Sequence, residues 1–117
     1  MSSYIHHLEC TVCGKVHSAD RLWTVSSCCG KVLFPRYDLA NMRKEIDRDR
    51  LGARPNGMWR FEELLPVKDP EFRVDLGEGG TPLLEAAELG KMMGLNRLFI
   101  KEEGLNPTGT FRARGIS

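Results

Sequence analysis

Two cysteine pairs, each followed by a glycine, constrain the fold of this chain more than any other feature of its sequence. The first pair has the spacing C-x2-C-G over residues 10–14, and the second reads C-C-G over residues 28–30. A zinc ribbon uses two such turns, each at the tip of a hairpin, so that four thiolates surround one ion. The pattern therefore predicts a small hairpin domain whose metal ligands are Cys10, Cys13, Cys28 and Cys29.

The second pair departs from the regular spacing of such a ribbon. Neighbouring cysteines point their side chains apart in extended chain, so binding one ion with both is awkward. Ser27 stands where a cysteine would restore a C-x-C pair, and His17 offers an imidazole as a substitute ligand. Two interpretations stay open: a structural zinc ion, or a degenerate turn that holds no metal and packs its thiols as small apolar groups.

The composition excludes several classes of protein. Of the 117 residues, 41% are hydrophobic and 28% are charged, which is typical of a globular chain. Seventeen Lys and Arg against 16 Asp and Glu give a net charge of +1, so we expect no nucleic-acid partner. Apolar runs stay far below the roughly 20 residues of a membrane helix, and the first residues lack the pattern of a secretory signal. We therefore expect a cytoplasmic protein with reduced thiols and no membrane partner.

The chain divides into three segments of different amino-acid composition. Residues 1–37 hold all four cysteines and all three histidines, residues 38–73 are charged and helical in pattern, and residues 74–117 are rich in glycine. In the first segment, residues 4–8 and 21–25 favour short strands, because aromatic and β-branched side chains are frequent there. We expect a cysteine ribbon, a helical connecting segment and an α/β segment, in that order.

Local signals predict further elements in the second and third segments. Asp38 can cap a helix that follows it, and residues 58–65 favour a short helix with a shared apolar face that contributes to a core. Residues 86–93 favour a helix and residues 97–101 a buried strand. One strand cannot form a sheet, so we expect the third segment to be the start of a larger, truncated domain.

Three strings of the sequence are specific when taken together: MWRFEELLP over residues 58–66, LGEGGTPLL over 76–84 and KEEGLNPTGTFRARG over 101–115. In this order, after a cysteine ribbon, they resemble the N-terminal part of the threonine synthase family, and the resemblance extends from Leu8 to Ser117. That family consists of pyridoxal-phosphate enzymes of fold type II. The resemblance implies an α/β fragment, in which a zinc-ribbon-like cysteine ribbon precedes the first elements of a fold type II domain.

The resemblance also implies a reaction, a cofactor and a partner. Threonine synthase is a lyase of threonine biosynthesis, and it converts O-phospho-L-homoserine and water to L-threonine and phosphate. Its pyridoxal 5'-phosphate acts as the electron sink and is held by a lysine as a Schiff base. Residues 74–117 would then be the start of this catalytic domain, and O-phospho-L-homoserine would be the small-molecule partner.

The lysine of the family's N-P-T-G-S-F-K string is replaced in this sequence. Residues 106–109 and Phe111 match the string, Thr110 stands for serine, and Arg112 stands where the lysine belongs. A Schiff base needs a neutral amine, whereas a guanidinium stays protonated. We therefore expect Arg112 to bind the cofactor non-covalently at best, and the chain alone to be inactive. Lys101, the nearest lysine, is not expected to replace it.

Other charged residues of these strings have ordinary interpretations. Glu102 and Glu103 are expected at a solvated strand end, and Arg114 is expected to be a surface or ion-pair residue. In the family, the loops that hold the substrate and the cofactor phosphate lie downstream, so we expect that further chain completes the fold. Two alternatives stay open: a small zinc-ribbon binding module, or a fragment of another fold type II enzyme such as cysteate synthase or threonine dehydratase.

Overall fold

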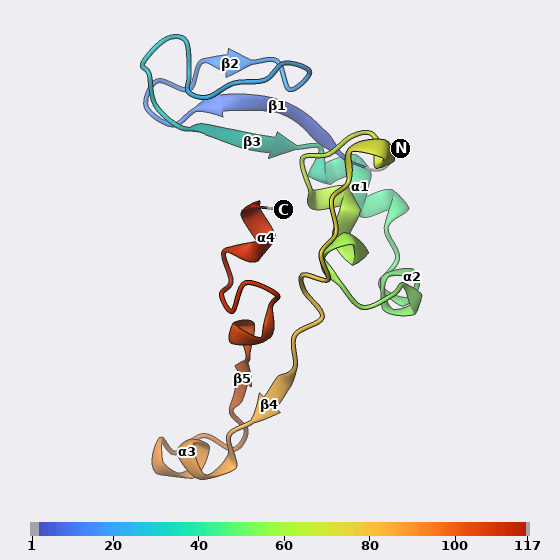
Figure 1. The fold of residues 1–117 in the computed structure, drawn as a ribbon, viewed down its shortest axis with the longest axis vertical. Helices are drawn as coiled ribbons and strands as arrows, with labels where there is room; N and C mark the ends of the chain where they lie inside the picture. The colour runs from blue at the N-terminus through green and yellow to red at the C-terminus, as the bar shows by residue number, and fades with distance from the viewer. Residues whose placement is uncertain (1–2, 117) are drawn as a thin grey trace. The chain divides into compact units, whose positions relative to one another are not determined.

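The computed structural model describes residues 3–116, and the chain forms two compact units. The first unit comprises the residues up to Arg54 together with Phe61–Arg73, and the second comprises Pro55–Arg60 together with the residues from Val74 onward. Strands and helices occur in both units, so the chain is a small α/β protein (Figure 1). Within residues 3–116, none of the helices has the length and apolar character that crossing a bilayer requires.

A three-stranded antiparallel sheet forms the centre of the first unit. Strand β1 (Ile5–Cys10) lies between β2 (Val16–His17) and β3 (Leu33–Tyr37), as Figure 1 shows. Leu33 pairs with Cys10, so the register brings the start of β3 beside the first cysteine. The strand expected over residues 4–8 is confirmed as β1, shifted toward its cysteine pair.

The strand expected over residues 21–25 is wrong. These residues form an irregular loop, in which the side chain of Leu22 is 98% exposed. The indole Nε1 of Trp23 donates a hydrogen bond to the carbonyl oxygen of Ser18 at 2.9 Å, which curls the loop back on itself. A high content of aromatic and β-branched residues is not sufficient for a strand when no neighbouring strand supplies hydrogen bonds.

Short helices follow the sheet. Helix α1 (Leu39–Glu45) begins after Asp38, whose carboxylate accepts a hydrogen bond from the backbone N–H of Asn41 at 3.0 Å, so the expected cap is confirmed. Helix α2 (Arg48–Ala53) is capped in the same way by the preceding aspartate. Two 3-10 helices come next, η1 (Met58–Leu64) and η2 (Pro70–Phe72).

Helix η1 does not provide the apolar core face expected from its sequence. It is kinked at Phe61, where φ is −107° and ψ is 34°, and the boundary between the two units falls at this residue. The side chains of Phe61 and Leu64 are 47% and 43% exposed, whereas Met58 is buried. The kink breaks the helical periodicity on which the expectation depended.

An ion pair closes the first unit around Glu63. Nη1 and Nη2 of Arg54 donate to the two carboxylate oxygens of Glu63, at 2.8 and 2.6 Å. The backbone N–H of Tyr4 also donates to the carbonyl oxygen of Glu63 at 3.0 Å, which ties the chain before β1 to η1. The Arg54 guanidinium lowers the pKa of the Glu63 carboxyl below its ordinary value, so the pair stays ionised at neutral pH.

A two-stranded sheet and a helix form one end of the second unit. Strand β4 (Leu83–Glu85) pairs with β5 (Phe99–Lys101) in antiparallel fashion, and helix α3 (Ala87–Met92) connects them. The expectation of one strand in this segment is wrong, because β4 completes a sheet with β5. The helix expected over residues 86–93 is confirmed, and Gly94 ends it with a φ of 71°.

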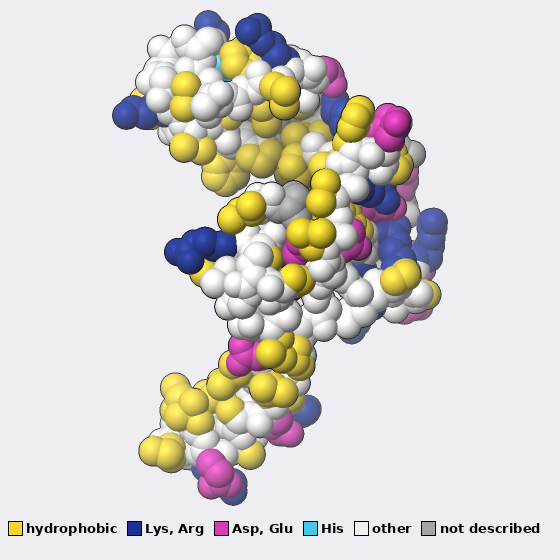
Figure 2. Space-filling model, in the orientation of Figure 1, with side chains coloured by type: hydrophobic (Ala, Val, Ile, Leu, Met, Phe, Trp, Pro, Cys, Tyr) yellow, Lys and Arg dark blue, Asp and Glu magenta, His cyan; other side chains and the backbone are white. Residues whose placement is uncertain are grey.

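The apolar side chains of this small sheet are largely exposed. Phe99 and Ile100 are 38% and 45% exposed, so the expectation of a buried strand is wrong. Figure 2 shows hydrophobic side chains gathered over β4, α3 and β5. A two-stranded sheet with one short helix has too few layers to cover both of its faces. The last elements of the unit are η3 (Glu103–Leu105) and α4 (Ala113–Ile116).

Candidate functional site

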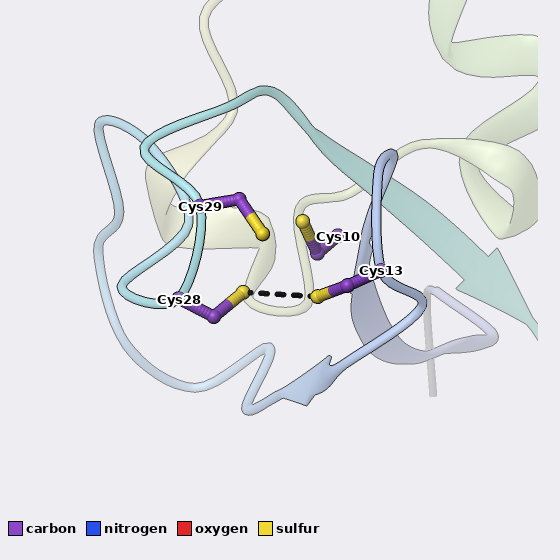
Figure 3. Close-up of side chains that lie close together, drawn as sticks. All are labelled: Cys10, Cys13, Cys28 and Cys29. Carbon is purple, nitrogen blue, oxygen red and sulfur yellow. Dashed lines mark hydrogen bonds between the residues drawn. The ribbon is translucent and has the colours of Figure 1, made fainter.

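The four cysteines converge on one point in the first unit. They come from the end of β1, the turn after it and a second turn before β3, and their sulfur atoms point toward one another (Figure 3). All four Sγ atoms lie within 4.8 Å of one another, and those of Cys13 and Cys28 are 3.4 Å apart. All four cysteines are free thiols, and Cys10 is buried with 1% of its surface exposed.

A tight turn presents the first two thiols. The backbone N–H of Cys10 donates to the carbonyl oxygen of Lys15 at 2.9 Å, and the N–H of Gly14 donates to the carbonyl oxygen of Cys10 at 3.0 Å. Gly14 has a φ of 72°, a conformation that disfavours side chains with a Cβ. The turn is fixed to the sheet because the N–H of Thr11 donates to the carbonyl oxygen of Val32 at 3.2 Å.

A second turn presents the other two thiols. The backbone N–H of Ser26 donates to the carbonyl oxygen of Lys31 at 2.7 Å, and the N–H of Gly30 donates to the carbonyl oxygen of Ser26 at 2.9 Å. Cys28 and Cys29 therefore lie in a turn and not in extended chain. The objection to neighbouring ligands rested on extended geometry, and the turn removes it by directing both side chains toward the other pair (Figure 3).

His17 is not among the ligand atoms that converge. Its Nδ1 lies 2.9 Å from the carbonyl oxygen of Lys15, and its Nε2 lies 3.2 Å from Oγ of Ser27. Its ring packs edge-on against Trp23, with ring centroids 4.9 Å apart, and the residue is 5% exposed. The hypothesis of a substitute ligand is wrong, because both ring nitrogens of this histidine already have partners. The contact with Ser27 joins β2 to the second turn.

The electrostatics of the cluster favour a bound cation. Hydrogen bonding with the Ser26 hydroxyl and with nearby backbone amides lowers the pKa of the Cys10 thiol to about 6. The neighbouring Cys13 thiol and burial raise the pKa of Cys29 to about 12. One thiolate forms readily, whereas each further thiolate is repelled by the negative charge already present at close range. A divalent cation relieves that repulsion, and thiolates are ligands that zinc prefers.

The sulfur geometry is close to that of a tetrahedral zinc site. Zinc–sulfur bonds of about 2.3 Å place the sulfurs of a tetrahedron roughly 3.8 Å apart. The sulfurs of Cys10, Cys13, Cys28 and Cys29 lie within 4.8 Å of one another, so small side-chain rotations would complete the tetrahedron. The donor set therefore fits zinc.

Arg112 lies in the second unit, on the loop between η3 and α4. The loop contains a turn in which the N–H of Gly109 donates to the carbonyl oxygen of Asn106 at 2.7 Å, with a φ of 70° at Gly109. Arg112 is exposed, and its guanidinium carbon lies 5.3 Å from the centroid of the Phe111 ring. The Arg112 side chain is thus a cation at the surface of its unit.

A polar network around Glu103 supports this loop. Arg114 donates from Nε and Nη2 to the Glu103 carboxylate at 2.6 and 2.7 Å, and Oγ1 of Thr81 donates to the same carboxylate at 2.6 Å. Asn106 donates from Nδ2 to the Glu103 carboxylate at 3.1 Å, and its Oδ1 accepts from the N–H of Gly79 at 3.0 Å. The network therefore joins the second and third strings of the sequence.

The network corrects one expectation and confirms another. Glu103 does not lie at a solvated strand end, because it begins η3 and its side chain is only 26% exposed. The Arg114 guanidinium and two further donors hold the pKa of its carboxyl well below the ordinary range. Arg114 is an ion-pair residue, as expected. Lys101 Nζ donates to the carbonyl oxygen of Thr81, so this amine is also part of the support beneath the loop.

Comparisons with known proteins agree on one family name. The chain is 40% identical over 110 residues to the threonine synthase of Methanocaldococcus jannaschii, an alignment covering 93% of this chain and 27% of that protein. It is 36% identical over 114 residues to the threonine synthase of Methanosarcina acetivorans, covering 97% of this chain and 27% of that protein. A shorter match of 63 residues, 44% identical, links it to the threonine synthase of Mycobacterium bovis.

Two other comparisons give no match: no protein-family model matches the chain, and no solved structure matches it. The fold type II architecture thus has no support from structural relatives. The chain spans about a quarter of the length of the two archaeal proteins that match nearly all of it. This chain is therefore a homologue of the threonine synthases, with an extent consistent with an N-terminal portion of such a protein.

Proposed function

We propose that the chain is the counterpart of the N-terminal portion of a threonine synthase, the lyase of threonine biosynthesis that forms L-threonine and phosphate from O-phospho-L-homoserine and water. The proposal is supported by the alignments to two archaeal threonine synthases, which cover 93% and 97% of this chain. In this interpretation residues 1–37 are a cysteine ribbon, residues 38–73 connect, and residues 74–117 begin the pyridoxal-phosphate domain.

The cysteine ribbon holds one zinc ion in a structural role. The convergence of four thiols supports this assignment, because four sulfur ligands fill a tetrahedral site and leave no position for a reactive water. The metal ligands are Cys10, Cys13, Cys28 and Cys29. A zinc ion there would join the end of β1 to the second turn and fix the loop of residues 18–27.

The residues of the second unit do not fit covalent pyridoxal phosphate. The family's Schiff-base position is Arg112, and a guanidinium with a pKa above about 12 cannot supply the neutral primary amine that attacks the aldehyde. Lys101 lies at the end of β5, where its Nζ donates to the carbonyl oxygen of Thr81. The remaining role for Arg112 is a non-covalent ion pair with a phosphate or carboxylate.

It follows that this polypeptide alone does not turn over O-phospho-L-homoserine. The single observation that carries this conclusion is the arginine at residue 112, within a loop that otherwise matches the family string. The exposure of Arg112 supports it further, since a cation in water binds a phosphate group weakly.

Borohydride trapping tests the absence of a cofactor lysine. The chain is incubated with pyridoxal phosphate, reduced with borohydride and digested, and the labelled lysines are mapped by mass spectrometry. We expect Lys101 to be labelled no faster than Lys91, an exposed helical lysine paired with Glu88. Preferential and saturable labelling of Lys101, with Lys91 left unlabelled, would show that another lysine replaces the family's own.

Metal analysis tests the ribbon. The chain is purified under reducing conditions, and its zinc content is compared with that of a Cys13→Ser variant. We expect close to one zinc ion per chain in the first and a large loss in the second. A chain that folds and holds no metal would show that the four thiols form a degenerate turn.

A further inference from the structure

The two cysteine turns are copies of one backbone structure. In residues 10–15 and in residues 26–31, the first N–H donates to the sixth carbonyl oxygen, at 2.9 and 2.7 Å. The fifth N–H donates to the first carbonyl oxygen, at 3.0 and 2.9 Å. The fifth residue is a glycine with φ of 72° or 62°, and the sixth is a lysine. The sequences C-x-x-C-G-K and S-x-x-C-G-K therefore align without a gap.

This alignment changes which residue stands at which ligand position. Cys29 takes the place of Cys13, and Ser26 takes the place of Cys10. Cys28 corresponds to Val12 and has no equivalent in the first turn. A regular pair of turns would carry its fourth thiol at residue 26, so the serine at the regular ligand position is Ser26 and not Ser27.

Ser26 is buried beside the sulfur cluster. Only 2% of its surface is exposed, and its Oγ lies 3.4 Å from Sγ of Cys10. The same Oγ accepts a hydrogen bond from the backbone N–H of Lys31 at 3.1 Å. A hydroxyl has one proton to donate. A metal-bound thiolate carries no proton, so the contact with Cys10 requires that the Ser26 hydroxyl donate to it.

We propose that Ser26 occupies the regular ligand position without binding the metal. Its hydroxyl donates a hydrogen bond to the Cys10 sulfur. Cys28, whose counterpart in the first turn is not a ligand, supplies the fourth thiolate. This inference rests on the proposed zinc site. A neutral serine hydroxyl is not among the ligands that zinc takes in proteins, whereas the thiol of Cys28 lies 3.4 Å from that of Cys13.

Moving the thiol from residue 28 to residue 26 tests the proposed alignment of the two turns. Zinc and cobalt titrations under reducing conditions compare the native chain, Cys28→Ser, and the double variant Ser26→Cys with Cys28→Ser, which has the native number of thiols. We expect Cys28→Ser to weaken zinc binding more than about 100-fold. Loss of a residue that only hydrogen-bonds to a ligand weakens metal binding by about 10–100-fold, and loss of the ligand itself should cost more. We expect the double variant to regain binding and a four-thiolate cobalt spectrum.

A second comparison tests the hydrogen bond from Ser26. Ser26→Ala should weaken zinc binding by about 10-fold or more, because partners that orient a ligand typically contribute 10–100-fold. Thr24→Ala removes an exposed hydroxyl from the same loop and should leave binding unchanged. The charge-transfer band of the cobalt form should shift in Ser26→Ala, which a purely structural role would not produce.

Each other outcome overturns the inference in a recognisable way. If Cys28→Ser binds zinc as the native chain does, Cys28 is not a ligand and the inference fails while the zinc site stands. If the double variant, whether folded or not, fails to regain binding, residue 26 is not a ligand position. If the native chain binds no metal, both the zinc site and the inference built on it fail.

Discussion

The sheet of the first unit and the small sheet of the second are stabilised by different means. In the first, the ends of β1 and the second turn meet at four thiols, with Cys10 and Ser26 almost completely buried. In the second, β4 and β5 expose apolar side chains, and a polar network around Glu103 holds the loops. The stability of the first unit thus depends on a cluster of thiols that a metal ion can hold together. The stability of the second depends on hydrogen bonds and on the backbone conformation of its glycines.

Removal of the metal should have the largest effect, and it should act on the first unit. Structural zinc contributes roughly 10–16 kcal/mol in zinc-finger peptides, more than a small three-stranded sheet can replace by packing. We therefore expect a chelator to abolish the protected amide signals of β1 and β3, measured by NMR hydrogen exchange, and excess zinc to restore them. Unchanged protection after verified metal removal would contradict a metal-dependent sheet.

The second largest effect is expected at Gly79, in the second unit. Its φ is 82°, and an added Cβ would lie 2.6 Å from the backbone nitrogen of Met58 and 2.9 Å from the carbonyl carbon of Gly57. Gly79→Ala combines left-handed strain with overpacking against backbone, so we expect a loss of about 2–5 kcal/mol, measured by chemical denaturation.

Gly94→Ala is the matched control for this prediction. Gly94 also has a positive φ, of 71°, but nothing lies within 4 Å of an added Cβ. Its substitution should cost only the conformational part, about 1–2 kcal/mol. Equal losses in the two variants would mean that the close approach at Gly79 does not contribute.

Low pH should weaken the second unit through Glu103. The pKa of this carboxyl is lowered in the folded chain by Arg114, Thr81 and Asn106, relative to an ordinary value of 4.5. A lowered folded pKa contributes stability above the unfolded pKa, and that stability is lost as the pH falls below about 4.5 toward the folded pKa. We expect the denaturation midpoint of this unit to fall between pH 5.5 and 3.5.

Two variants separate Glu103 from other carboxylates in this pH test. Glu103→Gln should lower the midpoint at pH 5.5 and flatten its dependence on pH. Glu88→Gln removes a carboxylate from an exposed pair with Lys91 and should leave the dependence close to native. A Glu103→Gln variant with the native pH dependence would show that other groups cause the loss.

The smallest effect is expected on the surface of α3. Lys91 and Glu88 form an ion pair three residues apart, with side chains 72% and 84% exposed. Because such pairs contribute about 0.3–0.5 kcal/mol, Lys91→Gln should shift the denaturation midpoint barely beyond its error. A large loss of stability would indicate that α3 contacts a partner in solution.

Local signals allowed part of the fold to be predicted from the sequence. The cap at Asp38, the helix that ends at Gly94 and the grouping of the cysteines each depend on a few neighbouring residues. Strand β3 contains Pro35 and was not expected, although it lies at the edge of its sheet, where a missing N–H is tolerated. Strand β4 is too short to be evident without its partner β5.

The candidate site shows the same division between local and distant contacts. The roles of His17 and Glu103 depend on Ser27 and Arg114, ten and eleven residues away, so no local pattern indicated them. Ser26 is different, because the match between C-x-x-C-G-K and S-x-x-C-G-K is visible in the sequence. The spacing between the cysteines points to Ser27, whereas the position of the glycine in each turn points to Ser26.

Phosphate release from O-phospho-L-homoserine tests the central claim most directly. The zinc-loaded chain is supplied with pyridoxal phosphate, and phosphate and L-threonine are measured together, with a chain-free mixture as the blank. Because Arg112 replaces the lysine of the family, we expect neither product above the blank. Sustained release of phosphate and L-threonine in equal amounts would contradict the account.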